Sequence, residues 1–376
     1  MSKEQYFDFE EDFHAQHDKK SSRRDKKVAS EKDRSKYKKS NMDQKKKIEA
    51  ALREDLPDLP KGQILAISPE GISVVSNQQI WLCQLKGSLK KEKNRAKNLI
   101  AVGDYVLFEP KDHFTGSIAH VLERKSFLSR ADNLSRRKEQ LIAVNIDQVI
   151  ITCSVVFPAI KPYLVDRYII AAQKGNMDPI IVVNKIDLIQ HKTPGVDLVT
   201  FEVEKEMFDA FFKAYSALDI PVIAVSTQTA EGLDQLRSLM HGKTSVFSGQ
   251  SGVGKSSLIN AVTGSNLKTG DIVGKTNKGS HTTTSTQLVA VEGGGFCVDT
   301  PGIKSFGIWD LDESEVLAYY PEFFPFASSC KFPNCQHLTE PQCEVRIAVE
   351  KGLISELRFA SYCALMASLS EEHRHR

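Results

Sequence analysis

A glycine-rich motif at residues 249–256 limits the possible folds of this chain more than any other segment. Its residues are Gly249, Gln250, Ser251, Gly252, Val253, Gly254, Lys255 and Ser256, which fit the pattern Gly-x-x-x-x-Gly-Lys-Ser. The motif follows a predicted strand at 244–247 and precedes a helix-like stretch that starts at Ser257. Such a strand–loop–helix unit points backbone N–H groups and a helix N-terminus at an anion. The pattern therefore predicts a phosphate-binding loop in an α/β domain with a mainly parallel sheet.

The side chains of this motif and of a second motif are suited to a nucleoside triphosphate with Mg²⁺. Lys255 can neutralise the β and γ phosphates, and the hydroxyl of Ser256 can bind Mg²⁺. Asp299 ends the apolar run 295–298 and begins Asp-Thr-Pro-Gly. Its carboxylate can reach Mg²⁺ through a water, and the N–H of Gly302 can sense the γ phosphate. We count all four, with Ser257, among the nucleotide-binding residues.

A third motif indicates which base is bound. Asn184, Lys185 and Asp187 form Asn-Lys-x-Asp directly after the apolar run 179–183. A carboxylate at Asp187 can accept hydrogen bonds from N1–H and N2–H₂ of guanine, a pair of donors that adenine lacks. Asn184 can brace the loop, and the stem of Lys185 can lie on the base. The strand-like run 221–225 ends at Ser226, whose loop can offer an N–H to guanine O6.

The order of the motifs along the chain is unusual. The guanine-type elements at 184 and 226 precede the phosphate loop at 249, whereas guanine-nucleotide folds usually begin with the phosphate loop. The same pocket forms if the original ends are joined and the chain is cut after the Asp-x-x-Gly switch. We therefore expect a circularly permuted GTPase domain, in which a following domain anchors the switch.

Length and composition fit a cytoplasmic protein of two or three domains. The chain has 376 residues, of which 41% are hydrophobic and 26% charged. No run approaches the length needed to cross a bilayer, and the N-terminus lacks the apolar stretch of a signal peptide. Five alternating apolar runs at 63–67, 72–75, 79–83, 104–108 and 117–121 suggest a small closed barrel, either OB-like or SH3-like, with a basic insert at 86–97.

The first 57 residues form a charged tail. Between Lys19 and Lys47 there are fourteen Lys and Arg against four acidic residues. Such a composition cannot bury enough apolar surface to offset chain entropy, so we expect disorder, or a helix only when bound. RNA is one candidate partner for this basic arm, and a solvated tail without a partner is the other.

A cluster near the C-terminus has the composition of a metal site. Cys330, Cys335, His337 and Cys343 place three sulfurs and one imidazole within fourteen residues. Tetrahedral Zn²⁺ prefers this donor set, and four protein ligands leave no open position for catalysis. We therefore expect one structural zinc per chain. Cys363 falls in a helical stretch and is expected to be a core residue.

Taken together, these motifs resemble the RsgA (YjeQ/YloQ) family of GTPases that depend on the small ribosomal subunit, over about residues 60–370. Supporting stretches lie at 103–104, 124–130, 145–148, 166–168 and 279–284. The resemblance implies an OB-fold barrel, a permuted GTPase domain and a zinc-binding C-terminal domain. It also implies rRNA binding and a role late in small-subunit maturation, with GTP hydrolysis stimulated by the subunit. We expect a monomer that does not associate with membranes.

Two departures from the family pattern stand out. Ser280 occupies a position where family members typically carry Arg within Gly-Arg-His-Thr-Thr-Thr, which could alter a ribosome or phosphate contact. The tail of 57 residues lies outside the common pattern. We expect domains at 1–57 (tail), 58–130 (barrel), 131–305 (permuted GTPase) and 306–376 (zinc-binding, helical).

The catalytic group is assigned to the segment between the phosphate loop and Asp299. Ile303 follows the Asp-Thr-Pro-Gly motif, where Ras-like enzymes carry the glutamine that positions water. His281 is our candidate to position or deprotonate that water, and Thr283 is our choice as the switch threonine on Mg²⁺, although Thr282 and Thr284 fit equally well. Two other functions remain open: a nucleotide-gated RNA-binding assembly factor with negligible catalysis, and an ATP-dependent RNA enzyme.

Overall fold

The computed structural model describes residues 58–87, 89, 99–132, 135–190, 198–264, 286–299 and 311–374. The predicted tail at 1–57 and most of the basic insert at 86–97 lie outside these residues. The segments around His281 and Gly302 lie outside them as well. The described residues thus cover the barrel, the nucleotide-binding sheet and the C-terminal segment.

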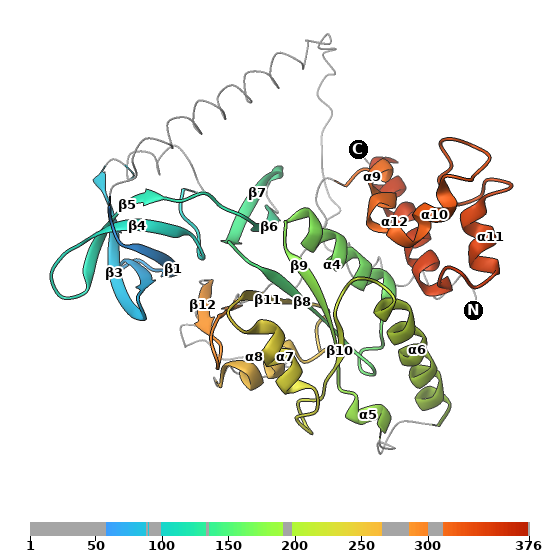
Figure 1. The fold of residues 1–376 in the computed structure, drawn as a ribbon, viewed down its shortest axis with the longest axis horizontal. Coiled ribbons are helices and arrows are strands. Elements are labelled where there is room, and N and C mark those ends of the chain that lie inside the picture. Colours follow the sequence, from blue (N-terminus) through green and yellow to red (C-terminus); the bar gives the residue numbers. More distant parts are fainter. Residues whose placement is uncertain are drawn as a thin grey trace, which may run out of the picture. The chain divides into compact units, whose positions relative to one another are not determined.

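Five short strands form the N-terminal barrel, as the alternating pattern predicts (Figure 1). They are β1 (Lys61–Ile67), β2 (Ile72–Ser76), β3 (Gln79–Leu85), β4 (Tyr105–Pro110) and β5 (Thr115–Val121). The strands pair in the order β1-β2-β3-β5-β4, and β4 pairs back with β1, which closes the ring. Within the ring β3 and β5 run parallel, and the other neighbours run antiparallel. This topology is that of an OB-fold, which decides between the two expected barrel types.

A β-hairpin that the sequence analysis did not predict follows the barrel. It consists of β6 (Phe127–Asp132) and β7 (Ser135–Val144), which pair antiparallel. The first six residues of β7 are polar or charged, so they lack the apolar alternation by which a strand is recognised. The hairpin spans position 130, and the domain boundaries at 57, 130 and 305 stay predictions.

The nucleotide-binding sheet is mainly parallel, as predicted. Its strands are β8 (Gln148–Ser154), β9 (Asp178–Asn184), β10 (Val222–Ala224), β11 (Thr244–Ser248), β12 (Gln287–Ala290) and β13 (Phe296–Asp299). The order is β10-β9-β8-β11-β13-β12, with β12 antiparallel to β13. β12 also pairs with β1 of the barrel through Ala66 and Gln287. The strands that end in the base motif and in the phosphate loop thus flank β8 on either side.

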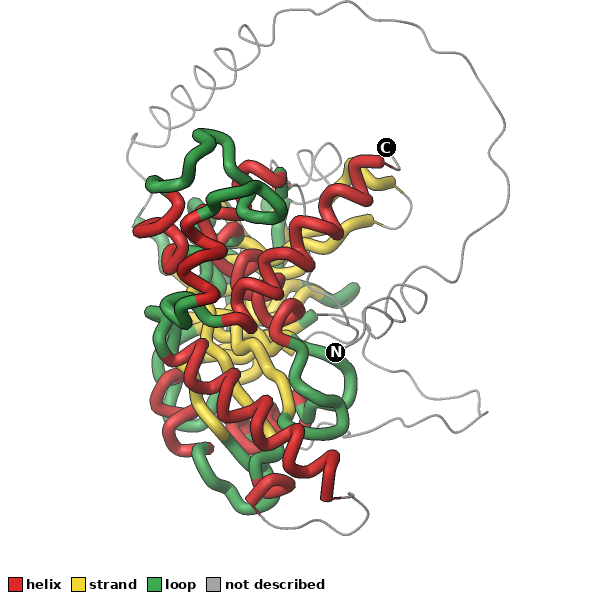
Figure 2. The backbone as a smooth tube through the Cα atoms, turned by 90° about the vertical axis from the view of Figure 1, so that its right-hand side faces the viewer, coloured by secondary structure: helices red, strands yellow, loops and turns green. Residues whose placement is uncertain are grey.

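Helices cover both faces of this sheet (Figures 1 and 2). The helices are α4 (Pro162–Lys174), α5 (Asp187–Gln190), α6 (Leu198–Ser216), α7 (Leu233–Met240) and α8 (Lys255–Thr263). In β8, Val149 and Ile151 pack in one core with α4 and α6, while Ile150 packs in a second core with α7 and α8. Burial on both faces explains why these strands are continuous apolar runs in the sequence.

The C-terminal segment is helical and has a core of its own. It contains α9 (Glu313–Val316), the 3₁₀ turns η2 (Leu317–Tyr319) and η3 (Pro321–Phe323), α10 (Phe324–Ala327), α11 (Glu344–Glu350) and α12 (Glu356–Arg374). The helical character expected for 306–376 is therefore observed in its described residues. Within the described residues, no helix is both long enough and apolar enough to span a membrane.

Candidate nucleotide site and candidate metal centre

The glycine-rich loop joins β11 to α8, as the motif predicts. Gly249 has φ of +144°, and a Cβ there would lie 2.0 Å from the carbonyl oxygen of Thr152 at the end of β8. Gly254 has φ of +95°, and a Cβ there would lie 2.3 Å from Nδ2 of Asn184. Glycine is therefore required at both positions, because any side chain would push the loop away from the neighbouring strand ends. The close approach shapes a cradle of the kind that holds phosphate.

Lys255 lies over this loop. Its Nζ donates hydrogen bonds of 2.7 Å to the carbonyl oxygens of Gly249 and Gln250. Burial lowers the pKa of Lys255 from 10.5 to about 8, because the loop and its neighbours keep water from the ammonium group. A phosphate that enters the cradle offers this group a stronger, charged acceptor than the two carbonyls.

We expect GDP affinity to fall as the pH rises above about 8. Phosphate favours the charged form of Lys255, so the pKa rises on binding. Below pH 8 the lysine is charged in both the free and the bound state, so affinity does not change with pH. Above pH 8 binding takes up a proton, and affinity falls by up to about tenfold per pH unit. Titration calorimetry from pH 7 to 9.5 measures the slope. Guanine itself also ionises at high pH, and it does so equally with both proteins, so Lys255→Met serves as the control. Equal slopes of affinity against pH in the two proteins would contradict the role of Lys255.

Asn184 connects the base motif to the phosphate loop. Its Nδ2 donates to the carbonyl oxygen of Val253 at 2.9 Å, and its side chain is almost fully buried. Its Oδ1 is buried without a hydrogen-bond partner among the described residues. A buried acceptor of this kind is costly unless a donor reaches it. The position is therefore suited to a ligand that brings N–H or O–H groups.

Lys185 makes a second connection between the two motifs. It adopts the left-handed backbone conformation at φ of +65°, and its Nζ donates to the carbonyl oxygens of Gly252, at 2.6 Å, and of Phe157. Asn184 and Lys185 thus both hold the phosphate loop, although they precede it by about 70 residues. The carboxyl ends of parallel strands are the usual ligand edge of an α/β sheet, and this edge brings the permuted motifs together.

Ser226 holds the carboxylate of Asp187. Its Oγ donates to Oδ1 of Asp187 at 2.5 Å and accepts from the backbone N–H groups of Gln228 and Thr229. Ser226 is fully buried, and its own N–H donates to the carbonyl oxygen of Glu231. Ser226 was expected in the base loop, but its contact with Asp187 could not be predicted, since residues 39 positions apart give no local signal.

The structure describes some of the other residues predicted for the nucleotide site, and the rest lie outside the described ranges. Gln250 and Ser251 lie in the loop, and Ser256 and Ser257 lie in the first turn of α8. Asp299 ends β13, where its backbone pairs with Gln287, as expected for a strand end beside β11. His281, Thr283 and Gly302 lie outside the described residues.

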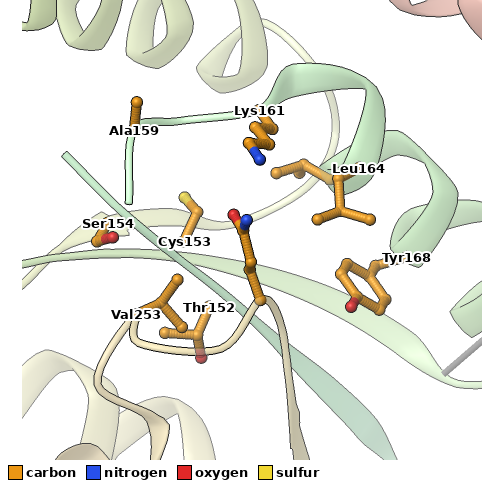
Figure 3. Close-up of a pocket in the computed structure, with 10 residues that line it drawn as sticks. Thr152, Cys153, Ser154, Ala159, Lys161, Leu164, Tyr168 and Val253 are labelled. Atoms are coloured by element: carbon orange, nitrogen blue, oxygen red, sulfur yellow. The ribbon is translucent and has the colours of Figure 1, made fainter. Parts of the chain in front are cut away.

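A small cavity separates the phosphate loop from α4 (Figure 3). Leu164 and Tyr168 line it from the helix, and Gln250 and Val253 line it from the loop. The end of β8, Ala159, Lys161 and Val165 also line it. The phosphate loop and the first half of α4 thus face each other across this cavity.

The four predicted metal ligands lie together. Their ligand atoms are all within 4.8 Å of one another, at Cys330, Cys335, His337 and Cys343. The Sγ atoms of Cys330 and Cys343 are 3.9 Å apart, and Nδ1 of His337 is 3.5 Å and 3.4 Å from them. Zinc–sulfur and zinc–nitrogen bonds in a tetrahedron require edges of about 3.8 Å and 3.6 Å. The donor set and its spacing therefore fit Zn²⁺.

Two residues that the sequence analysis missed organise this cluster. Glu340 accepts hydrogen bonds from the backbone N–H groups of Gln336, Leu338 and Thr339 at 2.7–3.1 Å. Tyr362 of α12 donates from its hydroxyl to the carbonyl oxygen of Gln336 at 2.9 Å. These contacts fix the loop that carries His337 and tie it to the C-terminal helix.

An OB-fold followed by a sheet on which guanine-type motifs precede the phosphate loop defines a circularly permuted P-loop GTPase. The sequence profile of the RsgA GTPase family matches residues 121–309. The chain belongs to this family, and it is a GTP-hydrolysing enzyme that uses guanine nucleotide and Mg²⁺. The expected family and fold class are confirmed.

Several known proteins are similar to the chain. Small ribosomal subunit biogenesis GTPase RsgA of Chlorobaculum parvum is 41% identical over 288 residues, which are 74% of this chain and 88% of the relative. RsgA 2 of Bacteroides thetaiotaomicron is 36% identical over 77% of this chain and 90% of the relative. The crystal structure of YjeQ from Thermotoga maritima aligns with a TM-score of 0.63 at 30% identity, over 82% of this chain and 98% of that one. YloQ, described as a circularly permuted GTPase, aligns at 0.64 and 26%, over 85% and 98%.

Proposed function

We propose that this GTPase acts in late maturation of the small (30S) ribosomal subunit, binding its rRNA and hydrolysing GTP when the subunit stimulates it. The names of the related proteins support this biological role. The observation that carries the GTPase chemistry is the contact of Asn184 and Lys185 with the phosphate loop. Because of it, one nucleotide can touch the base motif and the phosphate loop together.

The base is read by Asp187 and the loop after β10. Ser226 occupies one side of the Asp187 carboxylate, which leaves the remaining lone pairs for N1–H and N2–H₂ of guanine. The N–H groups of residues 226, 228 and 229 are used within the turn. The N–H of Thr227 is not among these donors, and we assign it to guanine O6. The stem of Lys185 lies along the base.

The phosphates are held by residues 249–257. Backbone N–H groups of the loop surround the β phosphate, and Lys255 neutralises the β and γ oxygens. Ser256 and Thr283 would supply oxygen ligands for Mg²⁺, and Asp299 would orient a water beside it. The ion would offset the charge that develops during phosphoryl transfer. The N–H of Gly302 would donate to the γ phosphate.

We assign positioning of the attacking water to His281. Replacing it with alanine is expected to lower subunit-stimulated hydrolysis by about 10²–10⁴-fold, the usual contribution of a general base, and to leave GDP affinity nearly intact. Phosphate release in the presence of purified subunits measures the effect. His241→Ala, an exposed histidine at the end of α7, is the control. Unchanged stimulated turnover would discard the assignment.

The remaining features of the chain fit this role. We propose that the barrel and the basic arm contact rRNA phosphates, that the cysteine cluster holds one structural zinc, and that the protein is a cytoplasmic monomer without a membrane partner.

The comparison of GTP hydrolysis with and without small subunits tests the proposed role in subunit maturation. We expect strong stimulation. GTP binding without stimulated turnover would favour the nucleotide-gated assembly factor instead, and ATP competing as well as GTP would favour an ATP-dependent RNA enzyme.

A further inference from the structure

A buried ion pair joins α4 to the C-terminal helix α12. Arg358 donates from one terminal nitrogen to Oδ1 of Asp166, and the side chains are 3% and 1% exposed. The two residues are 192 positions apart in the sequence. Neither residue belongs to the nucleotide site or to the metal cluster, yet α4 faces the phosphate loop across a small cavity.

The pair lies at a junction of several elements. Nε of Arg358 donates to Glu322 of η3 at 2.7 Å. The hydroxyl groups of Tyr215 on α6 and of Tyr320, between η2 and η3, donate to the two oxygens of Asp166 at 2.8 Å and 3.3 Å. The guanidinium also stacks 4.2 Å from the ring centre of Tyr320. A planar, forked cation is needed here, because it satisfies two carboxylates at once.

Such a junction resists small displacements. Charges taken out of water are stabilised only while their hydrogen bonds keep good geometry, so moving α12 relative to α4 would leave a buried charge unpaired. A second ion pair, Lys174 with Glu315 at 3.0 Å, also joins α4 to the C-terminal segment. Its side chains are 26% and 49% exposed, so water can replace that contact at little cost.

Helix α4 is shared by three parts of the molecule. Val165 and Ile169 pack in the core of the nucleotide-binding sheet, whereas Ile170 packs in the core of the C-terminal segment. Leu164 and Tyr168 point into the cavity under the phosphate loop (Figure 3). A rigid helix in this position transmits a shift at one contact to the others, because close-packed interfaces do not deform smoothly.

We propose that Arg358 is a positioning residue for the nucleotide site. By holding Asp166 it fixes α4 to the C-terminal segment, so that nucleotide binding at the phosphate loop and the placement of that segment are coupled through α4. Coupling of this kind is reciprocal: what binds at the loop changes the stability of α12 contacts, and what moves α12 changes nucleotide affinity.

Amide hydrogen exchange of the full-length, zinc-loaded protein, with and without a non-hydrolysable GTP analogue, tests the proposal. In the wild type we expect the analogue to slow exchange in α12 by about fivefold or more, the lower end of typical coupling. In Arg358→Lys, a single ammonium cannot satisfy both carboxylates, and in Asp166→Asn the charge is lost without a change of shape. Both variants should still show protection at residues 249–258, but less than about twofold in α12.

The control is Lys174→Met, which removes the exposed ion pair between the same two segments and should keep the wild-type response. If the ion pair had only a structural role, the variants would exchange faster in α12 by the same factor with and without the analogue. The ratio of the two exchange rates would then equal that of the wild type. That result would overturn the proposal, as would a wild-type α12 that does not respond to the analogue. Should Arg358→Lys not fold, Asp166→Asn decides the question alone.

Discussion

Asp187→Asn is expected to weaken GDP and GTP binding by about 10²–10⁴-fold and to create affinity for xanthosine nucleotides. The carboxylate accepts two hydrogen bonds from guanine, and each hydrogen bond to a charged group contributes about 1.5–3 kcal/mol. An amide can accept only one of them and turns its NH₂ toward the guanine amino group. Xanthine has a carbonyl oxygen at that position, so the same NH₂ becomes a donor for it. Titration calorimetry with GDP and xanthosine diphosphate measures both effects.

The matched control for this variant is Asp209→Asn, an exposed carboxylate on α6 that should bind GDP as the wild type does. Ser226→Ala provides an intermediate case. It keeps the carboxylate but removes the hydrogen bond that orients it, so GDP affinity should fall by about tenfold. If Asp187→Asn bound GDP within threefold of the wild type, the carboxylate would not read the base.

Cys335→Ser is expected to abolish zinc binding and to unfold the C-terminal segment. Structural zinc sites contribute about 10–16 kcal/mol of apparent binding free energy, which is comparable to the stability of a typical domain. Residues 328–343, which carry the cluster, form turns and bends without a helix or strand, so loss of the metal should destabilise them first. Elemental analysis should find one zinc per chain in the wild type and none in the variant. Limited proteolysis should then cut between 311 and 350.

Cys363→Ser separates ligand loss from loss of a thiol. Cys363 lies in α12 and packs against the same C-terminal core, but it is not part of the four-ligand cluster. This variant should retain one zinc and resist the protease. Zinc retention by Cys335→Ser, or zinc loss by Cys363→Ser, would show that the ligand set is different.

The parts that sequence could predict are those with a local signal. The phosphate loop is specified by eight consecutive residues; Gly249 is required by its approach to the backbone of Thr152, and Gly254 by its approach to the side chain of Asn184. The buried strands β8 and β9 contain continuous apolar runs, and β2 of the barrel alternates between buried and half-buried residues. The permutation followed from motif order alone. For the cysteine cluster, spacing predicted four ligands, and the structure brings all four together.

The parts that could not be predicted depend on contacts between distant residues. The hydrogen bond from Ser226 to Asp187 and the ion pair of Arg358 with Asp166 join residues far apart in the chain. In α4, Asp166 looks like an ordinary helical acid, and only the packing of α6, η3 and α12 around it shows that it is buried. The hairpin β6–β7 has a polar sequence that carries no strand pattern. The short helices α9 and α10 contain four residues each, too few for helical periodicity.

A crystal structure of the protein with Mg²⁺ and a non-hydrolysable GTP analogue is the most direct test of the permuted site. We predict that one bound nucleotide touches both motifs, with the Asp187 carboxylate on N1 and N2 of guanine and Nζ of Lys255 on the β and γ phosphates. A nucleotide held at the phosphate loop with its base away from Asp187, or an analogue bound elsewhere, would contradict it.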